Sequence, residues 1–190
     1  MTLDNPPVEM RTARLLIRRL TVADTASFFE IFSHAEVMRY GSSPPMAAMA
    51  EAENKIASIL AHHEKGDLFQ LAITRLSDNR MIGTCTLHQI HVQNRRAEVG
   101  YALGRPYWGN GYMNEAMHAL VDHAFEQMKM HRLEADIDPR NIASAKSLER
   151  LSFVREGLLR ERWIVGGEVS DSALYGLLAS EWKNHRPTVR

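Results

Sequence analysis

The residues with the clearest chemical potential lie at positions 107–115, where the chain runs Tyr-Trp-Gly-Asn-Gly-Tyr-Met-Asn-Glu. Gly109 and Gly111 stand between a strand-like run and an amphipathic helical run. Such a turn gathers free backbone N–H groups at the positive end of a helix dipole, which favours an anion and most often a phosphate. A tight strand-to-helix connection without a ligand is the alternative. The Walker and G-x-G-x-x-G patterns are absent, so neither an NTPase nor a dinucleotide dehydrogenase is indicated.

The strand expected before this turn, Arg95 to Gly104, has two unlike faces because side chains alternate along a strand. One face is apolar and carries Ala97, Val99, Tyr101 and Leu103. The other carries Glu98, Gly100, Ala102 and Gly104. A face with so little side-chain bulk lets an extended ligand lie against the backbone. A single carboxylate, Glu98, then stands at one end of that face.

A third group of polar residues follows a later strand. Asn141 is a good N-cap for the next helix, and Pro139 just before it fits a turn. Ser144 lies one turn into that helix and Lys146 follows it. Local hydrogen bonding at a helix start is a sufficient role for both Asn141 and Ser144.

The elements that position these residues follow from periodicity and turn signals. Strands are predicted at 14–20, 68–76, 81–92, 95–104, 133–137, 153–165 and 168–178. Helices are predicted after the N-cap Thr21, from Met46 to Glu64 with Gly66 closing it, from Met113 to Met130, and from Asn141 to about Leu151. Antiparallel hairpins and crossover helices are mixed, which predicts an α+β fold with a mixed, mostly antiparallel sheet of about seven strands and about four helices.

Composition narrows the class of protein. The chain has 190 residues, 45% of them hydrophobic, which favours a single domain over 1–190 with a core at about 12–182. Formal net charge is zero, so nucleic acid and anionic membrane are not indicated as partners. One cysteine, Cys85, excludes an internal disulfide, and neither a secretory signal nor an apolar run of about 20 residues is present. We expect a cytoplasmic protein.

The stretch from Ala97 to Leu103 through Trp108 to Ala116 resembles the cofactor motif, [Q/R]-x-x-G-x-[G/A], of the GNAT superfamily of acyl-CoA-dependent N-acetyltransferases. The run from Asn141 to Phe153 resembles the second block of that family. The opening Thr12 to Arg18 is similar to the branch that acetylates ribosomal-protein N-termini and includes antibiotic-modifying relatives. The chain departs from the motif at Trp108 and Met113, and a serine, Ser152, replaces the usual glycine before Phe153.

The resemblance implies a GNAT fold whose splayed strands form the coenzyme A cleft, with a bulge in the strand that carries Glu98. It implies acetyl-CoA as cosubstrate, Glu98 as the base for the amine proton and, in the ribosomal branch, Ser144 as acid or thiolate partner. The cofactor-binding residues it implies are Tyr101, Ala102, Leu103, Trp108, Gly109, Asn110, Gly111, Tyr112, Met113, Asn141 and Lys146. Met113 is bulkier than the motif residue, so we expect it to narrow the approach to the pyrophosphate.

The acceptor is left open by the sequence. A protein N-terminal α-amine is the first expectation, although zero net charge gives no sign of a ribosome-seeking surface. A small amine (an antibiotic, amino acid or polyamine) and a non-catalytic acyl-CoA-binding regulatory domain are the alternatives. The branch also suggests a homodimer. The nine histidines form no H-E-x-x-H motif and there is no cysteine pair, so no metal is expected. We expect the acceptor pocket near the first two helices, the loop 40–46 and the last hairpin.

Overall fold

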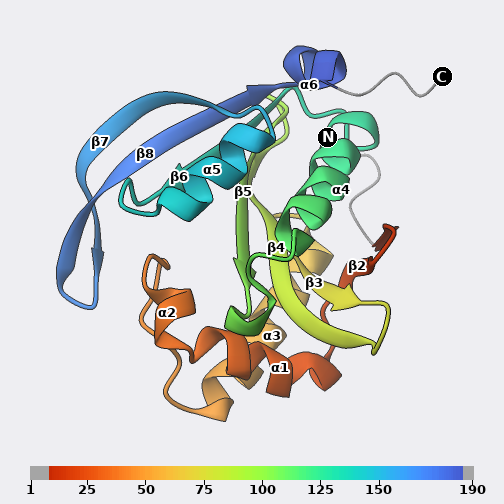
Figure 1. Ribbon diagram of the computed structural model, residues 1–190, viewed down its shortest axis with the longest axis vertical. Helices are drawn as coiled ribbons and strands as arrows, with labels where there is room; N and C mark the ends of the chain where they lie inside the picture. The colour runs from red at the N-terminus through yellow and green to blue at the C-terminus, as the bar shows by residue number, and fades with distance from the viewer. Residues whose placement is uncertain (1–8, 186–190) are drawn as a thin grey trace.

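The computed structural model describes residues 9–185, with side chains to Trp182, and shows one eight-stranded sheet in this range (Figure 1). The strands are β1 (Glu9–Arg11), β2 (Leu15–Arg19), β3 (Phe69–Arg75), β4 (Arg80–His91), β5 (Arg96–Leu103), β6 (Arg132–Ile137), β7 (Val154–Val165) and β8 (Glu168–Leu178). The α-helices are α1 (Thr25–Phe32), α2 (Ala35–Met38), α3 (Met49–Lys65), α4 (Tyr112–Glu126), α5 (Ile142–Arg150) and α6 (Ala179–His185). Two 3-10 turns, η1 (Val22–Asp24) and η2 (Arg105–Tyr107), complete the set.

The sheet order is β1-β2-β3-β4-β5-β6-β8-β7, and every neighbouring pair is antiparallel except β5 with β6. That one parallel pair covers only three positions, from Arg96 opposite Arg132 to Glu98 opposite Glu134. Beyond them β5 continues beside β4, whereas β6 continues beside β8. The two strands therefore separate after Glu98 and Glu134, which confirms the predicted splay. We refer to this separation as the β5–β6 opening.

Two hydrophobic cores hold the sheet in place. The larger lies on the α4 and α5 side, where Met117, Leu120 and Val121 of α4 are buried at helical spacing. The smaller lies on the other side, where Phe28 of α1 and Ile56 of α3 pack with Ala72 of β3. Ala72 pairs with Thr84, and Thr84 pairs with Ala102, so these three side chains lie on the face of the sheet that carries the smaller core. Glu98 is on the same face of β5 as Ala102 and therefore lies on that side too.

Most predicted elements are confirmed, with differences where local signals are weak. Strand β1 and helices α2 and α6 were not predicted, because three, four and seven residues carry too little periodicity, and they account for the larger numbers of strands and helices. Helix α4 ends at Glu126 rather than Met130, since Lys129 adopts a left-handed φ of 56°. Gly66 ends α3 with φ of 74°, as predicted. Ser152 adopts φ of 67°, the conformation for which a glycine is favoured.

The bulge implied for the strand carrying Glu98 lies instead on its neighbour. Between the pairs His88–Glu98 and His91–Arg96, β4 contains one residue more than β5. Gln89 absorbs the extra residue with a φ of 47°. The alternation of β5 therefore survives, and Ala97, Val99 and Leu103 are buried on the predicted core face.

No helix in the range 9–185 is long and apolar enough to span a membrane.

Candidate active site

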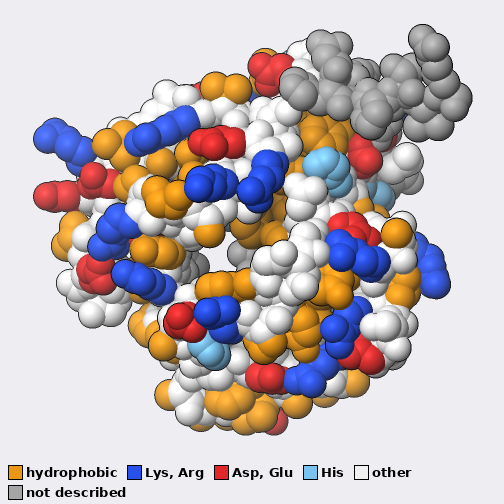
Figure 2. All heavy atoms as spheres, viewed as in Figure 1, with side chains coloured by type: hydrophobic (Ala, Val, Ile, Leu, Met, Phe, Trp, Pro, Cys, Tyr) orange, Lys and Arg blue, Asp and Glu red, His pale blue; other side chains and the backbone are white. Residues whose placement is uncertain are grey.

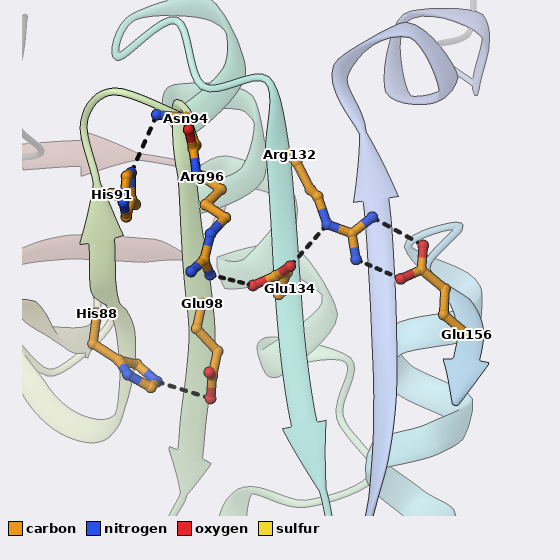
Figure 3. Close-up of polar contacts among 8 residues, drawn as sticks. All are labelled: His88, His91, Asn94, Arg96, Glu98, Arg132, Glu134 and Glu156. Atoms are coloured by element: carbon orange, nitrogen blue, oxygen red, sulfur yellow. Dashed lines mark hydrogen bonds and ion pairs between the residues drawn. The ribbon is translucent and has the colours of Figure 1, made fainter. Parts of the chain in front are cut away.

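Glu98 is the last β5 residue paired to β6, so its carboxylate stands at the start of the β5–β6 opening. Its side chain is 16% exposed, and its Oε1 lies 3.5 Å from Nε2 of His88 on the adjacent strand (Figure 3). A Cβ built on Gly100 would lie 3.7 Å from the same His88 nitrogen. The missing side chain at Gly100 thus leaves room on the face where Glu98 and His88 meet.

The surroundings of Glu98 favour its protonated form. Burial raises the pKa of Glu98 to about 7, and the negative charges of Asp136 and Glu134 add to the effect. The guanidinium groups of Arg162 and Arg96 act in the opposite direction. Burial also lowers the pKa of His88, so the imidazole facing Glu98 is neutral and supplies no counter-charge. A carboxylate with a pKa near neutrality is suited to take up and release a proton.

The carboxylate directly across from Glu98 is paired instead. Glu134 accepts hydrogen bonds from Arg96 Nη1 at 2.7 Å and from Arg132 Nε at 2.9 Å (Figure 3). Arg132 in turn binds both carboxylate oxygens of Glu156 on β7. A Cβ at Gly176 would come within 2.5 Å of Arg132 Nη2, so the glycine leaves space for this ion-pair chain.

The predicted anion loop has an open, backbone-lined form. Gly109 and Gly111 adopt φ values of 77° and 76°, and a Cβ at Gly109 would meet nothing within 4 Å. Trp108 Nε1 donates to the Leu103 carbonyl at 2.6 Å, which ties the loop to the end of β5. The Asn110 side chain donates to the Trp108 carbonyl at 3.0 Å. Helix α4 then begins at Tyr112, so its first N–H groups adjoin the open side of the loop.

Arg14 of the loop before β2 also belongs to this anion loop, although sequence reasoning gave it no role. Its Nη1 donates to the Asn110 carbonyl at 3.0 Å, and its guanidinium lies 4.6 Å from the centre of the Tyr112 ring. Glu115 in the first turn of α4 fixes it through Nε at 2.6 Å. Nearly a hundred residues separate Arg14 from the loop, so no local spacing could have signalled the contact.

Helix α5 brings a hydroxyl pair to the core side of β5. Asn141 Oδ1 accepts the Ser144 N–H at 3.1 Å, which confirms Asn141 as the N-cap. The Ser144 side chain is largely buried, and its Oγ lies 2.7 Å from the Tyr101 hydroxyl. That hydroxyl also donates to the Ser144 carbonyl at 3.2 Å. Burial raises the pKa of Tyr101 to about 12, so the phenol stays protonated near neutral pH.

The structure gathers the predicted site residues into two groups. Glu98, Tyr101 and Ser144 lie around the β5–β6 opening, and the loop from Trp108 to Tyr112 follows the end of β5. Ala102 pairs with Thr84 beside them. Two residues stand apart: Lys146 is exposed on α5, and Met113 packs partly buried against the larger core. That Met113 narrows the approach to the pyrophosphate stays a prediction.

Other polar groups place limits on the chemistry. Cys85 is fully buried, and burial raises the pKa of its thiol to about 12, which disfavours the thiolate needed of a nucleophile. Among residues 9–185, no group of three or more His, Cys, Asp or Glu side chains is arranged to hold a metal ion. Besides Arg14, sequence reasoning missed His88 and Asp136, because their proximity to Glu98 arises only from the strand register.

Comparisons with known proteins agree with this geometry. Residues 14–154 match the model of the acetyltransferase (GNAT) domain family. An uncharacterized N-acetyltransferase of Bacillus licheniformis, p20, is 34% identical over 171 residues, which is 90% of this chain and 96% of that protein. The Escherichia coli [ribosomal protein uS5]-alanine N-acetyltransferase is 23% identical over 185 residues, or 93% of this chain and 94% of its own length.

Solved structures show the same fold. Mycobacterium smegmatis RimJ in complex with CoA-disulfide superposes with a TM-score of 0.83, covering 95% of this chain and 91% of that one at 23% identity. An acetyltransferase (GNAT family) from Bacillus anthracis gives 0.82, with 92% and 100% coverage at 24% identity. GNAT acetyltransferases use acetyl-CoA as cosubstrate. This chain belongs to the GNAT family of acetyl-CoA-dependent N-acetyltransferases.

Proposed function

We propose that this enzyme transfers an acetyl group from acetyl-CoA directly to the free α-amine of a protein N-terminus. The observation that carries the proposal is Glu98, a carboxylate with its pKa raised to about 7 where β5 and β6 separate. A base is most effective when its pKa lies near the operating pH, and the raised pKa of Glu98 meets that condition near neutrality. An α-ammonium has a pKa of about 7.7–8.0, against about 10.4 for a lysine side chain. An α-ammonium therefore gives up its proton near neutral pH more readily than a lysine side chain does, which favours it as the acceptor.

The transfer proceeds in one displacement. Glu98 takes a proton from the ammonium, directly or through a water, and the neutral nitrogen attacks the thioester carbonyl carbon. As the carbon–sulfur bond breaks, the electron pair leaves on sulfur and the nitrogen loses its second proton, so the acetyl group stays on nitrogen as a neutral amide. That second proton balances the one that the departing thiolate takes up. A backbone N–H between Tyr101 and Leu103 stabilises the carbonyl oxygen as it becomes negative. The Ser144 hydroxyl, held 2.7 Å from that of Tyr101, protonates or hydrogen-bonds the departing thiolate.

The coenzyme fits the open side of the loop that follows β5. Its pyrophosphate would meet the N–H groups of Gly109, Gly111 and the start of α4, with Arg14 as the nearby cation. Its pantetheine arm would lie along the unpaired edge of β5 from Val99 to Leu103. Asn141 Oδ1 accepts the Ser144 N–H, and its amide nitrogen would donate to the arm.

The acceptor would approach between the loop after α2 and the last hairpin, where a hollow in the surface separates the α2 and α5 regions (Figure 2). The Arg140 guanidinium lies 5.9 Å from the centre of the Tyr40 ring, and a Cβ on Gly166 would lie 4.0 Å from Pro44 Cγ. These contacts join the three segments at the rim. An open rim of this kind admits the end of a polypeptide. Two aromatic residues of the last hairpin differ in exposure, since Trp163 is exposed whereas Tyr175 is buried in the core.

The relatives add support for a protein acceptor. The Escherichia coli protein that matches along 93% of this chain is named for alanine acetylation of ribosomal protein uS5. A small amine is the second candidate, because Asp136 and Glu134 beside Glu98 make the site attractive to any cation. A purely regulatory acyl-CoA-binding role is disfavoured by a carboxylate whose surroundings are those of a base.

A thiol-release screen tests the proposal. Acetyl-CoA is supplied with peptides bearing free N-termini, the same peptides N-terminally blocked but containing lysine, polyamines, aminoglycosides and free amino acids. We expect coenzyme A release with the free peptides and none with the blocked ones. Turnover of polyamines or aminoglycosides alone would overturn the N-terminal proposal in favour of a small-amine enzyme. Binding of acetyl-CoA without turnover of any acceptor would favour the regulatory role.

A further inference from the structure

Asp136 carries a polar atom that the fold leaves without a partner. Its side chain is 5% exposed. Oδ2 accepts hydrogen bonds from Arg162 Nε at 3.0 Å and Trp163 Nε1 at 3.3 Å. Oδ1 is buried, and no donor among the described residues reaches it. A buried acceptor without a donor is costly, so such an atom in a folded protein calls for an explanation.

The strand register places this atom at the reaction site. Asp136 is two residues beyond Glu134, where β6 has parted from β5 and pairs only with β8. Side chains two apart on a strand share a face, so Asp136 lies on the face that bears Glu134 and Glu98. The negative charge of Asp136 is among the causes that raise the pKa of Glu98, in agreement with this shared face.

We propose that Asp136 Oδ1 binds the ammonium group of the acceptor, a role that rests on the proposed amine acetylation. A primary ammonium has three N–H donors. One would bond to Asp136 Oδ1, and another would point to Glu98, which removes its proton. The inference adds a specificity-determining residue to the reaction and defines the acceptor as a cationic primary amine.

The two carboxylates have different surroundings and therefore different tasks. Asp136 Oδ2 accepts hydrogen bonds from the guanidinium of Arg162 and the indole N–H of Trp163. Glu98 has only a neutral imidazole beside it. Pairs of titratable groups in contrasting environments commonly divide binding from proton transfer. The Asp136 charge also raises the pKa of Glu98, so the group that binds the ammonium favours proton uptake by the base.

The test is Asp136→Asn, which keeps the side-chain size but replaces a carboxylate oxygen with an amide. The substitution removes a hydrogen bond between two charged groups. We therefore expect KM for a cationic acceptor to rise about 10- to 100-fold. We expect kcat to change much less and KM for acetyl-CoA to stay the same. An alkoxyamine is neutral at assay pH, so we expect its KM to be the same in the wild-type protein and in Asp136→Asn. Asp122→Asn is the matched control, because Asp122 also accepts a tryptophan indole N–H, from Trp182 at 2.8 Å, on the far part of α4.

A second measurement covers the case in which Asp136→Asn fails to fold. In Glu98→Gln, an acceptor peptide and its desamino analogue are compared as competitive ligands. We expect the peptide with the ammonium to bind about 10-fold tighter or more, since Asp136 is intact. Equal binding of the two peptides, or equal KM in the Asp136→Asn and Asp122→Asn proteins, would overturn the inference and indicate that Oδ1 holds only water.

These results separate the inference from the proposed function. If the screen identifies a polyamine as the acceptor, the N-terminal proposal fails, and the same variants test Asp136 on that polyamine. If peptides are acetylated but Asp136→Asn behaves like the control, the proposed function stands and the Asp136 inference fails.

Discussion

Glu98 and Glu134 are direct neighbours across β5 and β6, on one face of the sheet, yet their surroundings differ completely. Glu134 is bound by two guanidinium groups, whereas Glu98 has a neutral histidine at 3.5 Å and two further carboxylates acting on it. Figure 3 shows the contrast directly, since the ion-pair chain runs from Arg96 through Glu134 and Arg132 to Glu156 and leaves Glu98 outside it. The same side-chain type thus serves as a structural link at one position and as a candidate base at the next.

The two glutamates occupy equivalent positions, so the difference between a structural link and a candidate base comes from the positive charges that surround each carboxylate. Both glutamates are partly buried at the point where the strands part. The chain supplies arginines at 96 and 132 for Glu134 but histidine at 88 for Glu98. Burial alone would make the two carboxylates alike, so substitutions at each of them should have different effects on turnover and on stability.

The largest expected effect concerns turnover. Glu98→Gln should lower kcat about 10²- to 10⁴-fold, the usual contribution of a general base, while acetyl-CoA binding is unchanged. Glu134→Gln, the matched substitution on the facing strand, should alter kcat by less than about 10-fold because its carboxylate is engaged in ion pairs. Steady-state thiol release and calorimetric titration with acetyl-CoA measure the two quantities. An equal loss of kcat in both variants would contradict the assignment of Glu98 as the base and Glu134 as a structural residue.

A smaller effect follows from making Glu98 resemble Glu134. His88→Lys places a cation beside the carboxylate, and an opposite charge at this range lowers a pKa by about 1–3 units. The pKa of Glu98 should fall from about 7, and the weaker base should lower kcat at pH 8 about 10-fold. His91→Lys is the control, since it adds the same charge on the same strand at an exposed position. A similar pH profile in both variants would argue against His88 as the neighbour that matters.

For the free energy of unfolding we expect the reverse order, with Glu134→Gln having a larger effect than Glu98→Gln. Glu134→Gln removes the acceptor of two guanidinium groups that are themselves partly exposed, so we expect the free energy of unfolding to fall by about 1 kcal/mol. Glu98→Gln should leave it unchanged or raise it above pH 7, because it removes a charge that burial disfavours. Urea unfolding of the two variants at pH 8 measures the difference. Greater destabilisation by Glu98→Gln would contradict the assignment of the structural role to Glu134.

The pH dependence of that stability is a separate consequence of the raised pKa of Glu98. The folded pKa of Glu98, about 7, lies above the ordinary value of 4.5. A raised pKa contributes stability at low pH that is lost as pH rises from about 4.5 to about 7. The stability of the wild-type protein relative to Glu98→Gln should therefore decline across that window and level off above it. Parallel unfolding curves at each pH would show that Glu98 has an ordinary pKa in the folded protein.

Features of the site that lie within one helix, strand or turn could be predicted from the sequence. Contacts between residues of different elements could not. The Gly109–Gly111 turn, the N-cap Asn141 and the two faces of β5 depend on spacing within one element, and the structure confirms them. The bulge was misplaced by one strand, because Gln89 carries no sequence signal for a left-handed φ. The effect of Met113 on the approach to the pyrophosphate stays a prediction, and its side chain packs partly buried against the larger core.

The groups that tune Glu98 lie on other elements. His88 reaches it across β4 and β5, and Asp136 across the β5–β6 opening, through registers that only the folded sheet defines. Arg14 reaches the anion loop from a segment far away in the sequence. Periodicity can identify the elements that bear these residues, but it contains no information on which strands become neighbours. The family resemblance supplied that arrangement for Glu98 and Ser144, and it did not extend to the residues around them.

The pH dependence of turnover tests the central claim, that Glu98 takes the proton of the amine. The measurement is kcat at saturating acetyl-CoA and acceptor, from pH 5.5 to 9, for the wild-type protein and Glu98→Gln. We predict that wild-type kcat falls on the acid side with an apparent pKa of about 7, and that Glu98→Gln lacks this fall while being slower throughout. The same acid limb in both proteins, at similar rates, would contradict the claim and assign the limb to the acceptor itself.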